Sequence, residues 1–331
     1  MATVALDLLG GDGAPAVVAD AAARLVAAES DPGALDLILV GPVREAERLL
    51  RERDVPPGRV GVVDAGRSVP MDADPLATLR AHADVTVSVA AALVARGEAD
   101  AWVSVGHTGA AVAAAVLELG RVPGMSRPAL AVVVPSLAGP VVLLDSGAAP
   151  DATPDVLRQF AVAGHAYATT LGVADPAVGL LTIGGEDGKG DRLRRSAHDL
   201  LSETLPGLGI RYVGAVEGHD LALGARAQVV VTDGFTGNVL LKGLEGAVQW
   251  SAQRMGAAYG DAGPARSVVM ATATSDFAGG MLLGVDGVTV IGHGAGTAEE
   301  ICACVRLAAR TADMGLVERM SLALERAVPH V

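Results

Sequence analysis

Short runs of Val, Leu and Ile alternate along the chain with longer Ala-rich stretches. The apolar runs are almost continuous and lead into turns that contain Gly, a pattern typical of parallel strands covered on both faces. We expect these strands at residues 3–9, 35–41, 59–65, 101–106, 129–135, 140–147, 177–184, 211–216, 227–234 and 287–294. The stretches between them predict helices at residues 14–29, 42–53, 76–96, 109–120, 153–171, 192–204, 238–258 and 297–311.

This alternation predicts an α/β fold, a three-layer αβα arrangement around a mainly parallel or mixed central sheet. The 331 residues contain no fixed-period repeat and no low-complexity linker. A chain of this length suffices for one large core or for two ordinary domains. We therefore expect a single unit over residues 1–331, with two lobes as the other arrangement that the pattern allows.

Composition narrows the class of protein. Hydrophobic residues make up 51% of the chain and charged residues 19%, which excludes a disordered protein. The longest apolar stretches carry charges or stop short of the roughly 18–20 residues that a membrane span needs. The N-terminus lacks the basic region of a signal peptide, and the two cysteines, Cys302 and Cys304, cannot form a disulfide framework, so we expect a cytoplasmic protein. A net charge of −13 and an aromatic content of 2% argue against nucleic acid as a partner.

Several loops that follow predicted strands are rich in Gly and polar residues. In open α/β sheets, ligands bind where such loops lead from the carboxyl ends of strands into helices. Exposed backbone N–H groups and helix starts hold anions, so these loops predict a site for phosphate or a similar oxyanion. They lie at residues 9–15, 105–111, 145–151, 183–191 and 233–238.

Motifs for other chemistries are missing. The loop at 183–191 is not a Walker A loop, because its glycines have the wrong spacing and Gly190 follows Lys189 where Ser or Thr is needed. No dinucleotide fingerprint has the correct spacing, which argues against nicotinamide chemistry. Neither an HxH or HExxH pattern nor a GxSxG elbow occurs, so we expect no metal, no cofactor and no serine nucleophile.

Lysine and asparagine are scarce in this chain. Only two of the 25 basic residues are Lys, namely Lys189 and Lys242, and Asn238 is the single Asn. A compositional bias of this kind spares Lys and Asn where Arg or Asp cannot supply the same chemistry. For Lys189 and Asn238 this favours a functional role over the ordinary alternatives, a solvated loop lysine and a helix N-cap. Lys242 lies one turn beyond Asn238 on the same helix face, and a surface lysine is an equal alternative for it.

The Gly-rich loops belong to a longer ordered set of motifs. The set includes GGD at 10–12, GxTGA at 106–110, RPA at 127–129, LDxGA at 144–148, KG at 189–190, VEG at 216–218, DGFxGNxxLKxxEG at 233–246 and HG at 293–294. In this order the motifs resemble the PlsX-type phosphate acyltransferases of bacterial phospholipid synthesis over nearly the whole chain. The resemblance implies a homodimeric enzyme that moves an acyl chain from acyl carrier protein to inorganic phosphate. It also implies a fold similar to those of the isocitrate/isopropylmalate dehydrogenases and the phosphotransacetylases.

The resemblance places Lys189 and Asn238 at positions that the family needs for catalysis. We expect Lys189 to neutralise phosphate and the charge that develops on the thioester oxygen, and Asn238 to donate to that oxygen or orient phosphate. His107, the third predicted catalytic residue, stands where the family has Asn and is expected to replace that donor or to protonate the leaving thiol. The predicted substrate- and phosphate-binding residues are Gly10, Gly11, Asp12, Thr108, Gly109, Gly147, Asp233, Gly237, Lys242 and His293.

The chain also departs from the family pattern near these loops. Gly13 stands in place of a His, and Ala149, Thr182 and Ala215 stand in place of Asn. The losses leave two alternatives open. One is a paralogue of specialised metabolism that passes the acyl group to water, an amine or another thiol. The other is a non-catalytic protein that binds the carrier.

Partner surfaces are indicated by charge and by the resemblance. Carrier proteins are acidic, so docking to this acidic chain needs a local basic patch, for which the arginines at 191–196 and at 44–53 are candidates. The segment near 238–278 is the candidate for dimerisation or carrier contact. In the family, part of this region touches the membrane, but here it is short and only mildly apolar, which leaves peripheral membrane contact open.

Overall fold

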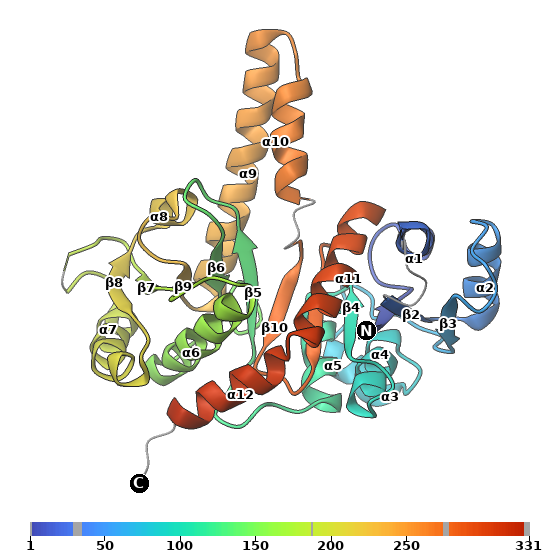
Figure 1. Ribbon diagram of the computed structural model, residues 1–331, viewed down its shortest axis with the longest axis horizontal. Helices are drawn as coiled ribbons and strands as arrows, with labels where there is room; N and C mark the ends of the chain where they lie inside the picture. The colour runs from blue at the N-terminus through green and yellow to red at the C-terminus, as the bar shows by residue number, and fades with distance from the viewer. Residues whose placement is uncertain (1, 29–34, 187, 274–277, 328–331) are drawn as a thin grey trace. The chain divides into compact units, whose positions relative to one another are not determined.

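A computed structural model describes residues 2–28, 35–186, 188–273 and 278–327 (Figure 1). The chain divides into two compact units. Unit 1 is formed by Met1–Pro123 and Asp276–Ser321, and unit 2 by Gly124–Ser275 and Leu322–Val331. Each unit contains its own mainly parallel strands and its own covering helices.

The described strands of unit 1 follow the order β3-β2-β1-β4-β11-β10. The pairs from β3 to β11 are parallel, whereas β10 and β11 are antiparallel. The strands are β1 (Ala2–Asp7), β2 (Leu35–Val40), β3 (Val60–Val63), β4 (Ala101–Ser104), β10 (Gly280–Leu283) and β11 (Val288–Ile291). Helices α4 (Thr86–Ala95) and α11 (Ala298–Asp313) both pack on β1 and β4. The other helices are α1 (Ala16–Ala28), α2 (Val43–Arg51), α3 (Pro75–Ala81) and α5 (Thr108–Glu118).

The described strands of unit 2 follow the order β5-β6-β9-β7-β8, in which only the β5–β6 pair is antiparallel. These strands are β5 (Ala129–Val134), β6 (Val141–Leu144), β7 (Val178–Leu181), β8 (Tyr212–Val216) and β9 (Val229–Val231). Helix α6 (Pro154–Thr170) packs on β6 and β9, and α7 (Arg192–Thr204) packs on β7 and β8. The remaining helices are η1 (Pro206–Leu208), α8 (Gly218–Leu223), α9 (Gly234–Tyr259), α10 (Gly263–Ala273) and α12 (Leu316–Ala327), which contains the boundary between the units.

Burial and capping explain why these segments take these structures. The largest fully buried side chains include Trp102 and Leu6 in unit 1, and Tyr167 and Phe160 in unit 2. Burying a large apolar side chain stabilises the fold by about 1.5–3 kcal/mol. Helices begin at recognisable caps. The side chain of Thr153, for example, accepts a hydrogen bond from the backbone N–H of Val156, and Pro154 follows at the first helical position.

The α/β architecture with a mainly parallel, mixed sheet confirms the predicted fold class, and every expected strand overlaps an observed one. The prediction of a single helix over 76–96 is wrong. It is two helices, α3 and α4, because Val85 is extended and pairs with Arg67 between them. Strand β10 was not expected, since its apolar run is only four residues long and no helix separates it from its antiparallel neighbour β11.

Helix α9 begins at Gly234, earlier than the expected start at 238, and continues to Tyr259. Helix α10 returns alongside it, so the two form a hairpin that projects from the rest of unit 2 (Figure 1). Trp250 and Tyr259 on this hairpin are 66% and 82% exposed. Within the described ranges, no helix combines the length and the apolar character that crossing a bilayer requires.

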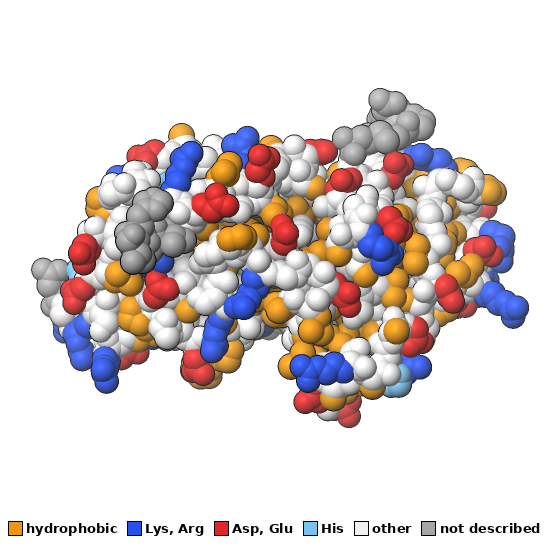
Figure 2. All heavy atoms as spheres, turned by 90° about the horizontal axis from the view of Figure 1, so that it is seen from below, with side chains coloured by type: hydrophobic (Ala, Val, Ile, Leu, Met, Phe, Trp, Pro, Cys, Tyr) orange, Lys and Arg blue, Asp and Glu red, His pale blue; other side chains and the backbone are white. Residues whose placement is uncertain are grey.

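The chain contains 38 Asp and Glu residues against 25 Lys and Arg residues. On the face drawn in Figure 2, acidic and basic side chains are interspersed among apolar ones. Helix α2 shows the same mixing on a smaller scale, because Arg48 pairs with Glu45 and Arg51 pairs with Glu47. A local basic site therefore has to come from arginines or lysines that lack such partners.

Candidate functional site

Three neighbouring parallel strands of unit 1 end at one edge of its sheet, namely β1, β4 and β11. The loops that follow them line a cavity of about 380 Å³. Predicted site residues from all three loops meet there, namely Gly10, Gly11, Asp12, His107 and His293. Apolar side chains such as Val69 and Val87 line it as well, and none of the described residues around it is Lys or Arg.

A buried carboxylate holds the loops of unit 1 together. Asp7, at the end of β1, accepts hydrogen bonds from the backbone N–H of Leu9 at 3.1 Å and from Ser104 Oγ at 2.7 Å. Ser104 Oγ in turn accepts from the N–H of Gly106 at 3.1 Å. Burial raises the pKa of Asp7, although these hydrogen bonds oppose the effect. Gly10 must be glycine, because a Cβ there would lie 2.5 Å from Asp7 Oδ2.

His107 is the N-cap of helix α5. Its Nδ1 accepts a hydrogen bond from the backbone N–H of Ala110 at 3.4 Å. A neutral imidazole that accepts at Nδ1 carries its proton on Nε2, so the ring can donate a hydrogen bond from that atom. Thr108 and Gly109 follow in the first turn of α5, where backbone N–H groups have no acceptor within the helix. This part of the cavity therefore presents hydrogen-bond donors.

Unit 2 repeats the arrangement with β6, β9 and β7, which are parallel neighbours. Asp145 follows β6 and is buried. It accepts hydrogen bonds from the N–H groups of Leu130 at 2.9 Å, Gly147 at 3.0 Å, Ala148 at 2.9 Å and Ala149 at 2.6 Å. Burial raises the pKa of Asp145 in spite of these four donors. The carboxylate thus fixes the shape of the loop from which Gly147 comes.

Asn238 lies at the start of helix α9, beside the Asp145 loop. Its Nδ2 donates to the carbonyl of Ser146 at 3.0 Å, and a Cβ on Gly147 would lie 3.2 Å from that nitrogen. Gly237 allows this close approach, since a Cβ there would collide with the carbonyl of Asp145. The site therefore needs Gly at both positions to bring the amide of Asn238 against the loop.

Asp233 is the N-cap of α9, where it accepts from the backbone N–H of Thr236 at 2.9 Å and from Thr236 Oγ1 at 2.9 Å. It also forms an ion pair with Arg194 of α7. Burial raises the pKa of Asp233, but the Thr236 hydrogen bonds and the Arg194 charge outweigh it, so the net pKa is lowered. Asp233 is therefore an ionised structural cap in this site.

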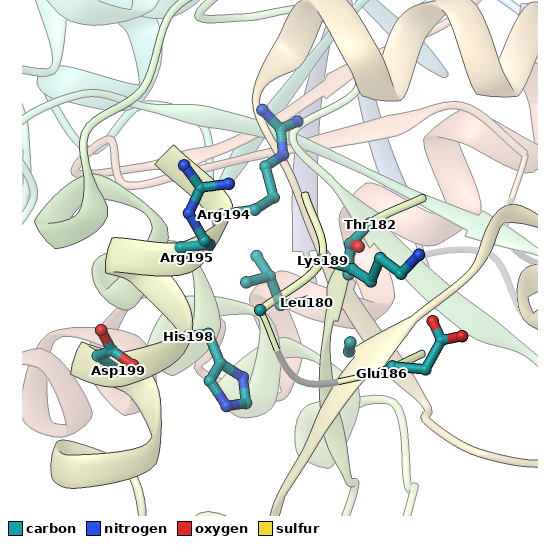
Figure 3. A pocket seen from close by; sticks show the side chains of 10 residues that line it. Leu180, Thr182, Glu186, Lys189, Arg194, Arg195, His198 and Asp199 are labelled. Atoms are coloured by element: carbon teal, nitrogen blue, oxygen red, sulfur yellow. The ribbon is translucent and has the colours of Figure 1, made fainter. Parts of the chain in front are cut away.

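Lys189 lies on the loop between β7 and α7, beside a cavity of about 150 Å³. Figure 3 shows Lys189 and Glu186 on the loop side of this cavity and Arg195, His198 and Asp199 on the α7 side. The stem of Lys189 packs near Gly184, where a Cβ would lie 3.3 Å from Lys189 Cγ. The side chain is exposed, and its ammonium has no hydrogen-bond or ion-pair partner in the part of the chain that the structure describes. Its charge is therefore available to an anion.

The structure separates Lys242 from this group. Lys242 Nζ forms an ion pair with Glu245 at 2.8 Å on the exposed side of α9, so its charge is balanced locally. Three polar residues of the site were missed by the sequence reasoning. Asp7 and Asp145 could have been found as the acids that end or follow buried strands before Gly-rich loops. Arg194 was expected only in the basic patch for the carrier, but its side chain is 11% exposed and pairs with Asp191 and Asp233, which no sequence signal indicated.

Comparison with known protein families identifies related chains. The family model described as "Fatty acid synthesis protein" matches residues 2–319. A phosphate acyltransferase of Desulfitobacterium hafniense is 37% identical over 336 residues, covering 98% of each chain. One from Thermosynechococcus vestitus is 40% identical over 341 residues, covering 99% of this chain and 96% of its own. A third, from Thermobifida fusca, is 40% identical over 321 residues, covering 91% of this chain and 86% of its own.

Solved structures resemble the fold at low sequence identity. A phosphotransacetylase of Streptococcus pyogenes has a TM-score of 0.64 at 19% identity, and the EutD phosphotransacetylase of Staphylococcus aureus has a TM-score of 0.63 at 15% identity. Both comparisons cover 94% of each chain. A 4-hydroxythreonine-4-phosphate dehydrogenase of Salmonella typhimurium has a TM-score of 0.55 at 13% identity, covering 94% of this chain and 99% of its own. These likenesses confirm the expected relation to the phosphotransacetylase fold.

Proposed function

The chain belongs to the PlsX-type phosphate acyltransferase family, and from this membership we propose which of its residues carry the reaction. The protein is an acyltransferase of phospholipid synthesis that transfers an acyl chain to inorganic phosphate. The proposed donor is a thioester on acyl carrier protein. A phosphate oxygen attacks the thioester carbon, the carbon–sulfur bond breaks, and the proton of hydrogen phosphate ends on the departing thiol. The products are acyl phosphate and the free carrier.

The phosphate site is proposed to lie in unit 2. The observation that carries this proposal is the ammonium of Lys189, which has no partner among the described residues beside a cavity at the carboxyl edge of the sheet. Hydrogen phosphate is already a nucleophile at neutral pH, so it needs charge neutralisation and positioning more than deprotonation. Lys189 supplies the charge. Lys242, which is paired with Glu245, is proposed to have a secondary role only.

Asn238 is proposed to stabilise the charge that develops during attack. The carbonyl oxygen of the thioester becomes negative in the transition state, and donors that are already in place stabilise it most. Gly147, Asp233 and Gly237 hold the Asn238 amide against the Asp145 loop, which keeps this donor oriented before the substrate arrives. Removing one such donor typically slows catalysis by about 100- to 1000-fold.

The cavity of unit 1 is proposed to bind an uncharged part of the acyl donor. This cavity of about 380 Å³ has apolar walls and no Lys or Arg among its described lining, which suits an uncharged ligand group. Gly10, Gly11 and Asp12 form one wall and His293 lies in another. His107, with its proton on Nε2, is proposed to donate to the donor's oxygen or sulfur, and Thr108 and Gly109 add backbone N–H groups.

Docking of the acidic carrier is proposed to use the start of α7. Arg192 and Arg195 are exposed there, directly after the Lys189 loop, and neither has an ion-pair partner among the described residues. In helix α2, the other sequence candidate, Arg48 pairs with Glu45 and Arg51 pairs with Glu47, which leaves Arg44 as its one arginine without an ion-pair partner among the described residues. Charge complementarity of this kind speeds association and selects the partner. The basic patch is therefore defined as Arg192 and Arg195.

We also propose that the protein is a cytoplasmic homodimer that uses the segment 238–278 as an interface. The exposed apolar side chains of Val239, Trp250 and Tyr259 on α9 support this proposal. Light scattering on the wild type and a Trp250→Ser variant tests it, and a monomeric wild type would contradict it. Flotation with phospholipid vesicles tests the other use of the same side chains, peripheral membrane contact.

The deciding experiment measures release of free carrier from acyl-loaded acyl carrier protein with and without inorganic phosphate. We expect release that depends on phosphate in the wild type and is lost in Lys189→Ala, with both proteins equally folded by circular dichroism. Release from the wild type without phosphate would mean transfer to water and would refute phosphate as the acceptor. Full activity in Lys189→Ala would refute the role of that lysine.

A further inference from the structure

The guanidinium of Arg194 is paired with carboxylates of the protein itself. Its side chain is 11% exposed. Nη1 donates to Asp191 Oδ2 at 3.0 Å, and Nη2 donates to Thr232 Oγ1 and Thr236 Oγ1 at 3.0 Å each and to Asp233 Oδ2. Two carboxylates around one guanidinium balance its charge, and the planar fork of Arg suits several acceptors at once. Arg194 therefore has the surroundings of a structural link rather than of an anion receptor.

The acceptors belong to the two segments that carry Lys189 and Asn238. Asp191 caps α7 two residues after Lys189. Asp233 caps α9, and Asn238 lies in the first turns of that helix. The guanidinium of Arg194 thus connects the start of α7 to the start of α9. In Figure 3 its side chain runs along the wall of the cavity from α7, while Lys189 comes from the loop opposite.

The chain directly after Lys189 packs on the stem of the same arginine. Gly190 has a φ of +92°, and a Cβ there would lie 2.7 Å from Arg194 Cβ. The carbonyl of Gly190 accepts from Arg195 Nη1 at 2.6 Å. Because the side chain of Lys189 has no partner among the described residues, its position depends on how the loop is held at Gly190 and Asp191.

We propose that Arg194 is a positioning residue that holds Lys189 and Asn238 in register for the transfer step. It acts through the two segments and does not touch phosphate. The proposal rests on the proposed function for the identity of the reaction. A displacement of about 1 Å between reacting groups can cost about 100-fold in rate, so a link of this kind affects turnover more than binding.

The first test is steady-state kinetics with acyl-loaded acyl carrier protein and inorganic phosphate. Arg194→Met keeps the stem and removes the fork, and we expect kcat to fall about 100-fold while KM for phosphate changes less than about twofold. Arg194→Lys keeps a positive charge without the fork, and its kcat should be about tenfold higher than that of Arg194→Met. Arg211→Met removes an exposed arginine paired with Asp175 in the same unit and should leave kcat unchanged. A raised KM for phosphate at unchanged kcat would overturn the proposal and make Arg194 a phosphate ligand.

A double-mutant cycle tests whether Arg194 works through Asp233. Asp233→Asn keeps a good N-cap but removes the ion pair. If the two act as one link, the double variant with Arg194→Met should be no slower than Arg194→Met alone. Losses in kcat that simply multiply would contradict the link.

Hydrogen–deuterium exchange tests the same proposal without the reaction. In Arg194→Met we expect faster exchange both in the loop at 183–190 and in the first turn of α9, and no such change in Arg211→Met. Unchanged exchange in both segments would overturn the positioning role. If the wild type transferred no acyl group to phosphate, the proposed function would fail while this measurement still decided the role of Arg194.

Discussion

The Gly-rich loops of units 1 and 2 have similar structures, but among the described residues only the cavity of unit 2 is lined by Lys and Arg. In each unit three parallel neighbours end at one edge, β1, β4 and β11 in one and β6, β9 and β7 in the other. A buried aspartate, Asp7 or Asp145, accepts hydrogen bonds from the loops, and burial raises the pKa of both. The cavity of unit 1 has no Lys or Arg among its described lining, whereas Lys189, Arg194 and Arg195 line that of unit 2.

The comparison shows that the shape of the loops and the charge of the site come from different residues. Glycines and a buried carboxylate shape the loops in both units, so these features alone do not determine which ligand binds. Charge is added in unit 2 by one helix, α7, and by the loop before it. Lys189 and Arg195 have no ion-pair partner among the described residues, whereas Arg194 is balanced by Asp191 and Asp233.

The largest effect is expected from reversing the electrostatics of the unit 2 site. Asn238→Asp keeps the size of the side chain but replaces a donor by a negative acceptor that faces the carbonyl of Ser146. We expect kcat to fall by about 1000-fold. Steady-state kinetics with a thermal unfolding control measures this effect. A variant that keeps more than about one tenth of the wild-type kcat would show that Asn238 is not the oxyanion donor.

A smaller loss is expected from spoiling the shape of the unit 1 site. In Gly10→Ala the new Cβ would lie 2.5 Å from Asp7 Oδ2 and 2.9 Å from the N of Gly106. We expect a loss of about 1–3 kcal/mol in the free energy of unfolding and about 100-fold in kcat/KM for the acyl donor. The matched control is Gly207→Ala, where a Cβ meets nothing within 4 Å. Equal behaviour of the two variants would refute the close packing of the Gly10 loop.

The ionised cap of helix α9 should make the stability of the protein depend on pH. The pKa of Asp233 is lowered by folding, so its contribution to stability is present above the usual value of 3.8 and is lost as pH falls through the folded pKa. We expect Asp233→Asn to cost about 1–2 kcal/mol at pH 7 and less at pH 3. Urea unfolding at the two pH values measures this, and a cost that grows toward pH 3 would contradict the assignment.

The smallest effect is expected at the basic patch. Replacing Arg192, the member of the patch that does not line the Lys189 cavity, by Glu should raise KM for the acyl carrier about fivefold, and the effect should shrink at high salt. KM for a short acyl-pantetheine thioester should not change, because that donor has no acidic surface. Arg51→Glu on α2 serves as the control, since Glu47 already pairs with that arginine. A change that is equal for both donors would show that the patch acts on the site itself.

The sequence was most informative where composition made a residue rare. Lys189 and Asn238 stood out because the chain contains two Lys and one Asn, and both lie at the carboxyl edge of the unit 2 sheet. Every strand expected from a continuous apolar run overlaps an observed strand, because buried parallel strands leave little room for polar residues. The position of each loop at a strand end then followed from the fold class.

Features that depend on distant pairing could not be predicted in this way. The break between α3 and α4 arises because Val85 pairs with Arg67, which no local periodicity reveals. Arg194 resembles the other arginines of α7 in sequence, and only its three-dimensional surroundings distinguish it. The proton position on His107 likewise depends on the N–H of Ala110, which is placed by the helix start.

The continuity of α9 has a mechanical consequence. Its 26 residues form one helix of about 39 Å, with Asn238 near one end and Tyr259 at the other. A straight helix transmits rotation along its whole length, so a small tilt at the base becomes a large sideways movement at the tip. Conversely, whatever holds the tip also restrains the orientation of the Asn238 amide. A movement of the hairpin tip would therefore change the orientation of Asn238 in the proposed site of unit 2.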